Sequence, residues 1–181
     1  MTFRSALLLA SLLAGCAGSG TAAPDLPPLR TVAHVDLDRY VGTWFEIASY
    51  PQRFQKGCTA TQATYTRRDD GQIGVRNRCN RDGLNGPESS AEGKARVVDK
   101  ATNAKLEVSF FWPFWGDYWV IDLGPEYEFA VVGHPSRKYL WILSRTRTLP
   151  APTYDAILER LRVQGYDLAK LQRTEQPVAT P

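Results

Sequence analysis

The sequence predicts an all-β domain followed by one helix. Eight short runs rich in aromatic and β-branched residues recur at the spacing of an all-β barrel, with turn residues between them. Trp44 lies at the start of the first run, and Arg145 ends the last. A guanidinium stacked on an indole forms a cation–π contact that strengthens without water, so this pair predicts the closed floor of a barrel. The expected strands span residues 43–50, 59–67, 72–79, 91–99, 105–110, 118–123, 126–133 and 138–145.

The N-terminal stretch predicts a secretory signal over residues 1–15. Arg4 supplies the positive charge, and the apolar run 6–14 that follows is too short to span a bilayer stably. Cys16 stands where cleavage would fall, although an ordinary signal with an accidental cysteine is the alternative. Residues 16–31 are mostly small residues and proline without an apolar period, which predicts a tether. The remaining chain is long enough for one core and too short for two domains.

Turn chemistry places the hairpin and the helix. Asp69, Asp70 and Gly71 join the second and third strands, because glycine tolerates the positive φ of a tight turn. Pro150 and Pro152 end the strand region. A helix is expected from residue 153 to about 164, with three aliphatic side chains on one face and a glycine after its end, and a short strand is expected near 167–173.

Strand alternation assigns the inward side chains, because successive residues of a strand point to opposite faces. The candidates for a cavity lining are Ala63, Tyr65, Val75, Asn77, Leu106, Val108, Phe110, Tyr118, Val120, Tyr139 and Trp141. An eight-stranded barrel is just wide enough to be filled by side chains or to hold one small ligand. Small inward residues, namely Ala63, Gly93 and Ala95, favour the open cavity.

Four loops are expected around the mouth, because alternate connections of a meander lie at the same end. They are residues 51–58, 80–90, 111–117 and 134–138. The third loop is strongly aromatic, which predicts a lid over an acyl chain or a contact with a bilayer; the alternative is that it folds back onto the core. Lys56 and other cations suit a carboxylate or phosphate headgroup unless they are simply solvated. The candidate mouth residues are Arg53, Trp112, Phe114, Trp115, Arg137 and Lys138.

Cys58 and Cys79 predict a disulfide near the mouth, since a secreted protein meets an oxidising compartment. Regular pairing around the hairpin turn sets Cys79 opposite Gln62, which leaves Cys58 roughly 13 Å beyond that level. A bend near Gly57 would be needed to bridge the gap. Free thiols would instead make Cys58 a candidate nucleophile, although no adjacent base is evident.

Other enzyme and nucleic-acid signatures are missing from the sequence. The net charge is +3 and the basic residues are scattered, so we expect no nucleic-acid partner. The chain has only two histidines, so we expect no metal site, no catalytic triad and no catalytic residue. No cofactor is expected. Glu46 and Asp122 are expected to point inward, where a carboxylate is more often hydrogen-bonded structure than an acid catalyst.

Two segments carry a resemblance to a known family. Residues 35–41 lead into Gly42, Thr43 and Trp44, and residues 140–144 lead into Arg145 and Thr146. The sequence of these two segments strongly resembles the lipocalins, and within them the bacterial outer-membrane lipoprotein lipocalins. The resemblance implies an eight-stranded antiparallel up-and-down barrel with one C-terminal helix packed outside, a domain over residues 32–176 and a tail over 177–181. The second motif of the family is usually Thr, Asp, Tyr in the turn after the sixth strand. Residues 123–127 depart from it here, which marks an outlying member of the family.

The resemblance also implies an anchor. Leu13, Ala14, Gly15 and Cys16 are similar to a bacterial lipobox, so cleavage before Cys16 would leave a diacylglyceryl thiol and an acylated amino terminus. Several acyl chains make such an anchor durable. Ala17 in place of aspartate favours the outer membrane, with the barrel facing the periplasm.

These observations predict a lipid carrier. We expect a membrane-anchored protein that stores or transports a fatty acid or lysophospholipid, with the acyl chain in the barrel and the headgroup at the basic rim. A structural or stress protein with a filled barrel and a protein partner is the main alternative. An enzyme that depends on Cys58 is the third.

Overall fold

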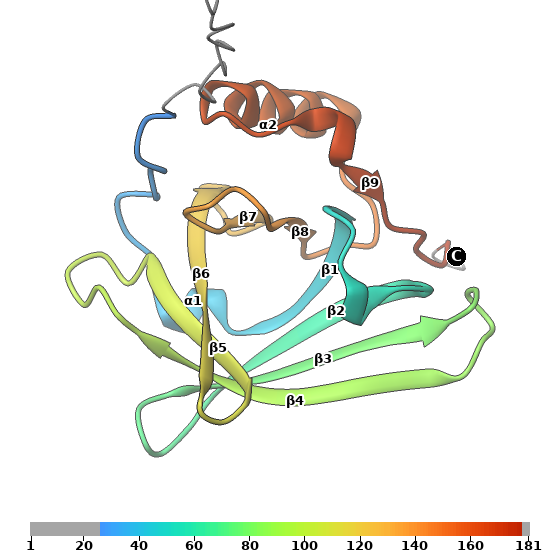
Figure 1. Cartoon of the computed structure of the whole chain (residues 1–181), viewed down its shortest axis with the longest axis horizontal. Coiled ribbons are helices and arrows are strands. Elements are labelled where there is room, and N and C mark those ends of the chain that lie inside the picture. Colours follow the sequence, from blue (N-terminus) through green and yellow to red (C-terminus); the bar gives the residue numbers. More distant parts are fainter. Residues whose placement is uncertain (1–25, 179–181) are drawn as a thin grey trace, which may run out of the picture.

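A computed structural model describes residues 26–178 and shows a closed antiparallel barrel of eight strands (Figure 1). The barrel closes because β1 pairs with both β2 and β8. A ninth strand, β9 (Gln172–Arg173), adds to β1 from outside. The expected fold is confirmed. The barrel strands are β1 (Gly42–Ser49), β2 (Cys58–Arg67), β3 (Ile73–Arg81), β4 (Glu88–Val97), β5 (Lys105–Phe111), β6 (Phe114–Leu123), β7 (Phe129–Gly133) and β8 (Leu140–Ser144).

The helices lie around the barrel. The main helix, α2 (Ala151–Val163), packs outside it, as expected, and buries Ile157 and Leu161. The helix includes Pro152 in its first turn. This is tolerated because proline lacks a backbone N–H and the N–H groups of the first turn have no partner within the helix. Three short helical segments were not expected: α1 (Leu37–Tyr40), η1 (Arg53–Gln55) and η2 (Leu168–Lys170). Among residues 26–178, no helix has the length and apolar character needed to cross a membrane.

Two apolar clusters lie on the two sides of the barrel wall. The inner cluster includes Trp44, Tyr65 and Val120. The outer cluster joins α2 to the outward side chains of β1, β6, β7 and β8. β7 is buried at every position and lacks polar alternation, because the inner cluster covers one of its faces and the outer cluster covers the other.

The aromatic segment at residues 111–117 is a tight hairpin, which corrects the expected long loop. β5 extends to Phe111 and β6 begins at Phe114, and these two residues pair across the turn. Only Trp112 and Pro113 connect the strands. Aromatic residues favour strands, so the pairing continues to the tip.

Cys58 and Cys79 form the predicted disulfide, with 5.4 Å between their Cα atoms. The needed bend is a bulge of β2 between Thr59 and Gln62, where Ala60 has a positive φ of 50°. The expected pairing of Cys79 with Gln62 was wrong, because Gln62 lies opposite Arg78. The bulge then shifts the register and brings Cys58 opposite Arg81. Since both sulfurs are bonded, Cys58 has no thiol to act as a nucleophile in this form.

The C-terminal segment seals the wall where β1 and β2 part. β1 pairs with β2 only from Gly42 to Phe45. Above that level, the Thr174 N–H donates to the Ile47 carbonyl, and the Ala60 N–H donates to the Glu175 carbonyl. The Gln176 amide donates to the carbonyls of Glu46 and Thr61, at 2.9 and 2.8 Å. Residues 174–176 thus replace the missing strand pairing.

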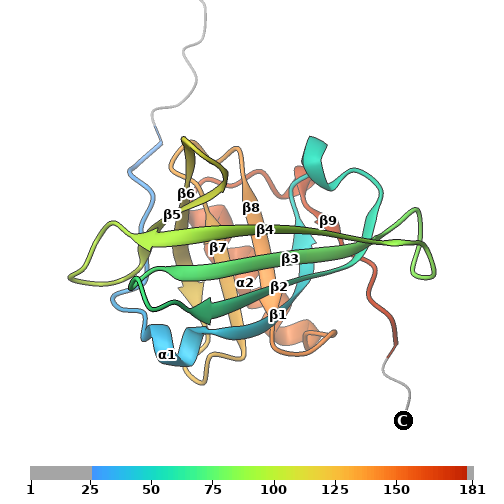
Figure 2. The ribbon, with the colours of Figure 1, turned by 90° about the horizontal axis from the view of Figure 1, so that it is seen from below.

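The N-terminal segment runs along the barrel from the mouth to the floor (Figure 2). Leu29, which we expected to lie in a free tether, is 7% exposed and belongs to the outer cluster. The Arg30 N–H donates to Gln164 at the end of α2, and the Val32 N–H donates to Val120 of β6. The expected signal, Cys16 and the tail from residue 179 lie outside the described residues.

Candidate ligand-binding site

The floor of the barrel is closed by Trp44 and Arg145. The Arg145 guanidinium carbon lies 3.7 Å from the centroid of the Trp44 ring, which is fully buried. The predicted stacking is therefore present. Arg145 also donates to five main-chain carbonyls, those of Arg39, Tyr40, Val41, Thr43 and Tyr127. The Trp44 indole N–H donates to the Tyr40 carbonyl at 2.8 Å. These bonds join the segment before β1 to the end of β8.

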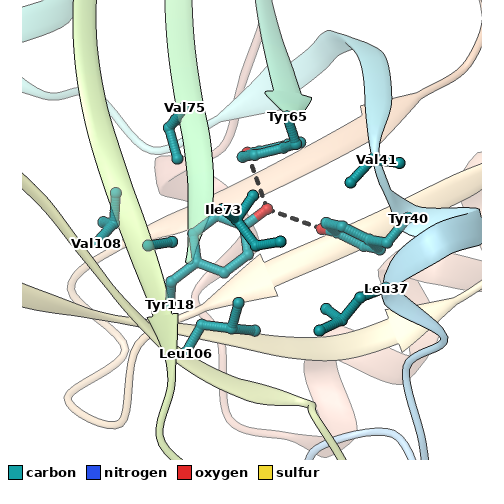
Figure 3. A pocket seen from close by; sticks show the side chains of 10 residues that line it. Leu37, Tyr40, Val41, Tyr65, Ile73, Val75, Leu106, Val108 and Tyr118 are labelled. Carbon is teal, nitrogen blue, oxygen red and sulfur yellow. Dashed lines mark hydrogen bonds between the residues drawn. The ribbon is translucent and has the colours of Figure 1, made fainter. Parts of the chain in front are cut away.

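Three tyrosines form a hydrogen-bonded cluster above the floor (Figure 3). The Tyr118 hydroxyl lies 2.8 Å from that of Tyr40 and 3.0 Å from that of Tyr65. Burial raises the pKa of Tyr65 to about 12 and holds the pKa values of Tyr40 and Tyr118 well above their ordinary range. Three hydroxyls share two hydrogen bonds, so one O–H donor remains available to a polar atom in the barrel.

The cavity above this cluster is smaller than the small inward residues led us to expect. Its volume is about 110 Å³, and a second space of about 10 Å³ beside the tyrosines holds at most one water. The rings of Trp44 and the three tyrosines occupy the lower half of the barrel, which explains the difference. The interior is therefore neither packed solid nor wide open.

Most of the predicted inward residues surround this space. Leu106 lines the small space at the floor. Val120 is buried in the inner cluster but lines neither space. Tyr139 does not line the cavity, because it precedes β8; it stacks on Trp141 at 6.0 Å and is half-buried. The predicted residues that line the main cavity are Ala63, Tyr65, Val75, Asn77, Val108, Phe110, Tyr118 and Trp141.

The 3-10 turn η1 covers the cavity as a lid. Gln55 holds it in place, because its amide nitrogen donates to Glu46 at 2.8 Å and its amide oxygen accepts from the Trp141 indole at 3.1 Å. Phe54 of the same turn lines the cavity and is still 62% exposed. Phe54 and Gln55 of the lid were missed as site residues because only the folded turn brings them over the barrel.

The two acidic candidates have different environments. Glu46 points inward as expected, and its carboxylate accepts from Ser49, Gln55 and Thr174. Asp122 points outward instead and pairs with Arg160 of α2 at 2.6 Å. A bulge between Val120 and Asp122 reverses the alternation, so the expectation for Asp122 was wrong. Within residues 26–178, no cluster of His, Cys, Asp or Glu could hold a metal ion.

An apolar groove of about 540 Å³ leads from the cavity to the mouth. Of the predicted mouth residues, Phe114 and Trp115 line it. Arg81 lines it as well and forms no ion pair within the described part of the chain; its guanidinium donates to the Lys56 carbonyl at 2.7 Å. Five residues line both groove and cavity: Phe54, Gln55, Thr61, Asn77 and Phe110.

The other predicted mouth residues do not reach the groove. Arg137 is taken up by main-chain carbonyls, donating to Gln164 at 2.7 Å, to Pro135 and to Pro27. Its side chain therefore ties α2 and the N-terminal segment together. Arg53 borders the outer side of the lid, and Lys138 and Trp112 are exposed and line none of these spaces.

Two polar atoms at the junction of cavity and groove are buried without a partner. They are Thr61 Oγ1 and Asn77 Oδ1. A buried polar atom without a hydrogen bond is costly, so these atoms mark a place where a polar group of a ligand would be favoured. Strand alternation had already placed Asn77 inward. Thr61 continues the inward series of Tyr65 and Ala63 into the bulge of β2, and it was missed because the predicted lining stopped at Ala63.

A closed barrel with a floor, a lid and a cavity walled largely by apolar side chains defines a protein that binds small hydrophobic molecules. A family model described as a lipocalin-like domain matches residues 35–176. The chain belongs to the lipocalin family.

Several known proteins are similar to the chain. Temperature-induced lipocalin-1 of Arabidopsis thaliana is 42% identical over 162 residues, covering 84% of this chain and 86% of the relative. Outer membrane lipoprotein Blc of Escherichia coli K12 is 42% identical over 156 residues, covering 83% and 86%. The Blc protein of Vibrio cholerae is 36% identical over 171 residues, covering 94% and 96%. Among solved structures, insecticyanin of Manduca sexta has the same fold, with a TM-score of 0.67 and 23% identity over 84% of this chain and 87% of that one.

Proposed function

We propose that this lipocalin is anchored in the outer membrane through Cys16 and binds a lysophospholipid or fatty acid, which it stores or transports. The observation that carries the proposal is the continuous path from the apolar cavity, beneath the lid, into the apolar mouth groove. The names of the similar Blc proteins and the sequence before Cys16 support the anchor and the outer-membrane location. No catalytic role is proposed.

The dimensions of the site suit a long ligand that extends out of the barrel. The cavity alone lies below the ~300 Å³ of a typical ligand pocket. It suits the distal part of an acyl chain, and the groove suits the remainder. Each buried methylene contributes about 0.8 kcal/mol, which provides affinity with loose selectivity for chain identity.

The polar atoms of the site favour a lysophospholipid. Thr61 Oγ1 and Asn77 Oδ1 lie where the acyl chain would meet its glycerol ester, and a hydroxyl and an amide oxygen suit an ester carbonyl and a glycerol hydroxyl. Arg81 in the groove suits the phosphate. It replaces Arg53, Arg137 and Lys138 as the headgroup residue that we propose.

Competition binding tests this function. Lysophospholipid should displace a fluorescent fatty acid from the mature protein, and Trp141→Ala should weaken the binding of both ligands because it removes cavity wall. Thr61→Val should weaken lysophospholipid binding about tenfold, the equivalent of one hydrogen bond, while fatty acid binding changes less. Thr59→Val, on the same strand but outside the cavity lining, is the matched control. Saturating titrations without binding would reject the proposal.

The anchor needs its own test. Mass spectrometry of the mature protein should find the diacylglyceryl and acyl groups on Cys16. An unmodified Cys16 would reject the anchor and leave the binding proposal standing.

A further inference from the structure

The mouth end of the barrel carries an unusual group of exposed aromatic side chains. Phe111, Trp112 and Phe114 at the β5–β6 hairpin are 79%, 82% and 76% exposed. Phe54 on the lid, which borders the same groove, is 62% exposed. Contiguous exposed apolar surface of this kind marks an interaction site, and Trp in particular favours the interface of a membrane with water. We call these four residues the aromatic rim.

The chain leaves the barrel at this same end. The first described residues, beginning at Leu26, lie beside the β7–β8 loop, where Pro27 accepts a hydrogen bond from Arg137. Figure 2 shows this blue segment starting at the end that carries the β5–β6 turn, whereas α1 lies at the opposite end. Cys16 precedes Leu26 by ten residues, which span at most about 36 Å when fully extended. A lipid on Cys16 therefore holds the start of the described chain, at the mouth end of the barrel, within about 36 Å of the bilayer.

Basic side chains lie near the aromatic rim. Lys94 lies over the Trp115 ring of the hairpin, 5.8 Å from its centroid, whereas Arg96, at 4.2 Å from the same ring, is already paired with Glu107 at 2.6 Å. On the loops across the mouth, Lys56 and Lys138 are exposed and form no ion pair within residues 26–178. Anionic headgroups attract such cations. Two copies meeting through this end would instead bring like charges together.

We propose that the aromatic rim docks on the surface of the bilayer that holds the Cys16 anchor, with the open end of the barrel against the lipids. Phe111, Trp112 and Phe114 enter the headgroup region, and the surrounding cations meet anionic lipid. A ligand then passes between bilayer and cavity without crossing bulk water. The orientation rests on the proposed anchor, whereas the affinity of the aromatic rim for lipid does not.

Tryptophan quenching tests the orientation. The acylated mature protein is placed in vesicles of phosphatidylethanolamine and phosphatidylglycerol, with and without bromine on the acyl chains. Bromolipid should quench a part of the fluorescence, and Trp112→Phe should abolish that quenched part because it retains the apolar contact but removes the reporter. Equal quenching in both proteins, or none in either, would overturn the proposal.

Vesicle binding without the anchor tests the surface itself. A mature Cys16→Ser chain should sediment with the same vesicles, and the added triple change Phe111→Ser, Trp112→Ser and Phe114→Ser should reduce this binding at least tenfold. Val98→Ser, a 56% exposed position in the β4–β5 turn at the floor end, should leave it unchanged. Undiminished binding of the triple variant would overturn the proposal.

Two further readouts separate the remaining outcomes. If the triple change converts a dimer to a monomer in sedimentation while vesicle binding stays constant, the aromatic rim is an interface between copies and the proposal fails. Far-UV circular dichroism and thermal unfolding of the triple variant should match those of the Cys16→Ser protein, which shows that the variant folds. If the wild-type protein binds no fluorescent fatty acid in solution, the proposed function is rejected and the docking result stays intact.

Discussion

At the scale of single residues, Arg145 stands out because one side chain joins three separate segments of the floor. It stacks on Trp44 and donates to carbonyls before β1, in β1 and before β7. Its guanidinium fans its donors in a plane, so several carbonyls can bind it while its face covers the indole. A lysine has one compact ammonium group and cannot do both.

Arg145→Lys should therefore lower the free energy of unfolding by about 1–3 kcal/mol, although the charge is retained. Urea unfolding followed by far-UV circular dichroism measures the change. Arg147→Lys is the control, because Arg147 lies over the Phe45 ring at 4.9 Å but is exposed. Equal effects of the two substitutions would show that the floor does not depend on the guanidinium.

At the scale of elements, few contacts hold the lid η1 on the barrel. It has no buried residue of its own, and Gln55 connects it to Glu46 on β1 and Trp141 on β8. A short segment with few buried contacts opens at lower free energy than the strands it covers. The disulfide fixes the following strand, so opening would be confined to the residues before Cys58.

Gln55→Ala should increase amide hydrogen exchange in residues 52–57 and speed ligand release about tenfold, since two hydrogen bonds of the closed state are lost. Exchange measured by mass spectrometry and stopped-flow release of a fluorescent fatty acid give the two readouts. Gln52→Ala serves as the control, because Gln52 makes only a 3.5 Å bond to Lys138 at the edge of the lid. Unchanged hydrogen exchange in Gln55→Ala would show that the two hydrogen bonds of Gln55 do not hold the lid closed.

At the scale of the whole molecule, the tyrosine cluster links stability to pH. Burial favours the neutral phenol, so the folded protein retains the Tyr65 proton up to a pKa of about 12, whereas the unfolded chain releases it near 10. Between these values the unfolded state binds fewer protons, and stability falls as the pH rises.

Unfolding free energy should therefore decline above pH ~10 and lose roughly 2–3 kcal/mol by pH ~12 through Tyr65 alone. Denaturant unfolding across this range measures it. Tyr65→Phe removes the titrating group, so its curve should be flatter over the same interval than that of the wild type. Parallel curves for the two proteins would contradict this account.

Strand alternation predicted much of the cavity wall, and its errors have local causes. Val75 and Val108 lie in regular pairing and point inward as predicted. Asp122 follows a bulge and points outward, and Tyr139 precedes its strand. Arg137 was expected at the mouth because it is a loop cation, but carbonyls from distant segments bind it. Nothing in the sequence around residue 137 records those carbonyls.

The sequence by itself determined the eight strands, the outer helix and the residues that close the floor, because strand periodicity and turn chemistry depend on near neighbours in the chain. Only the tertiary structure decided the size of the cavity, the hydrogen bond that holds the lid on β1 and the sealing of the wall by residues 174–176. These features depend on how side chains and carbonyls far apart in the chain meet once the barrel has closed. Such meetings are fixed by bulges and packing in three dimensions, which leave little trace in a linear pattern.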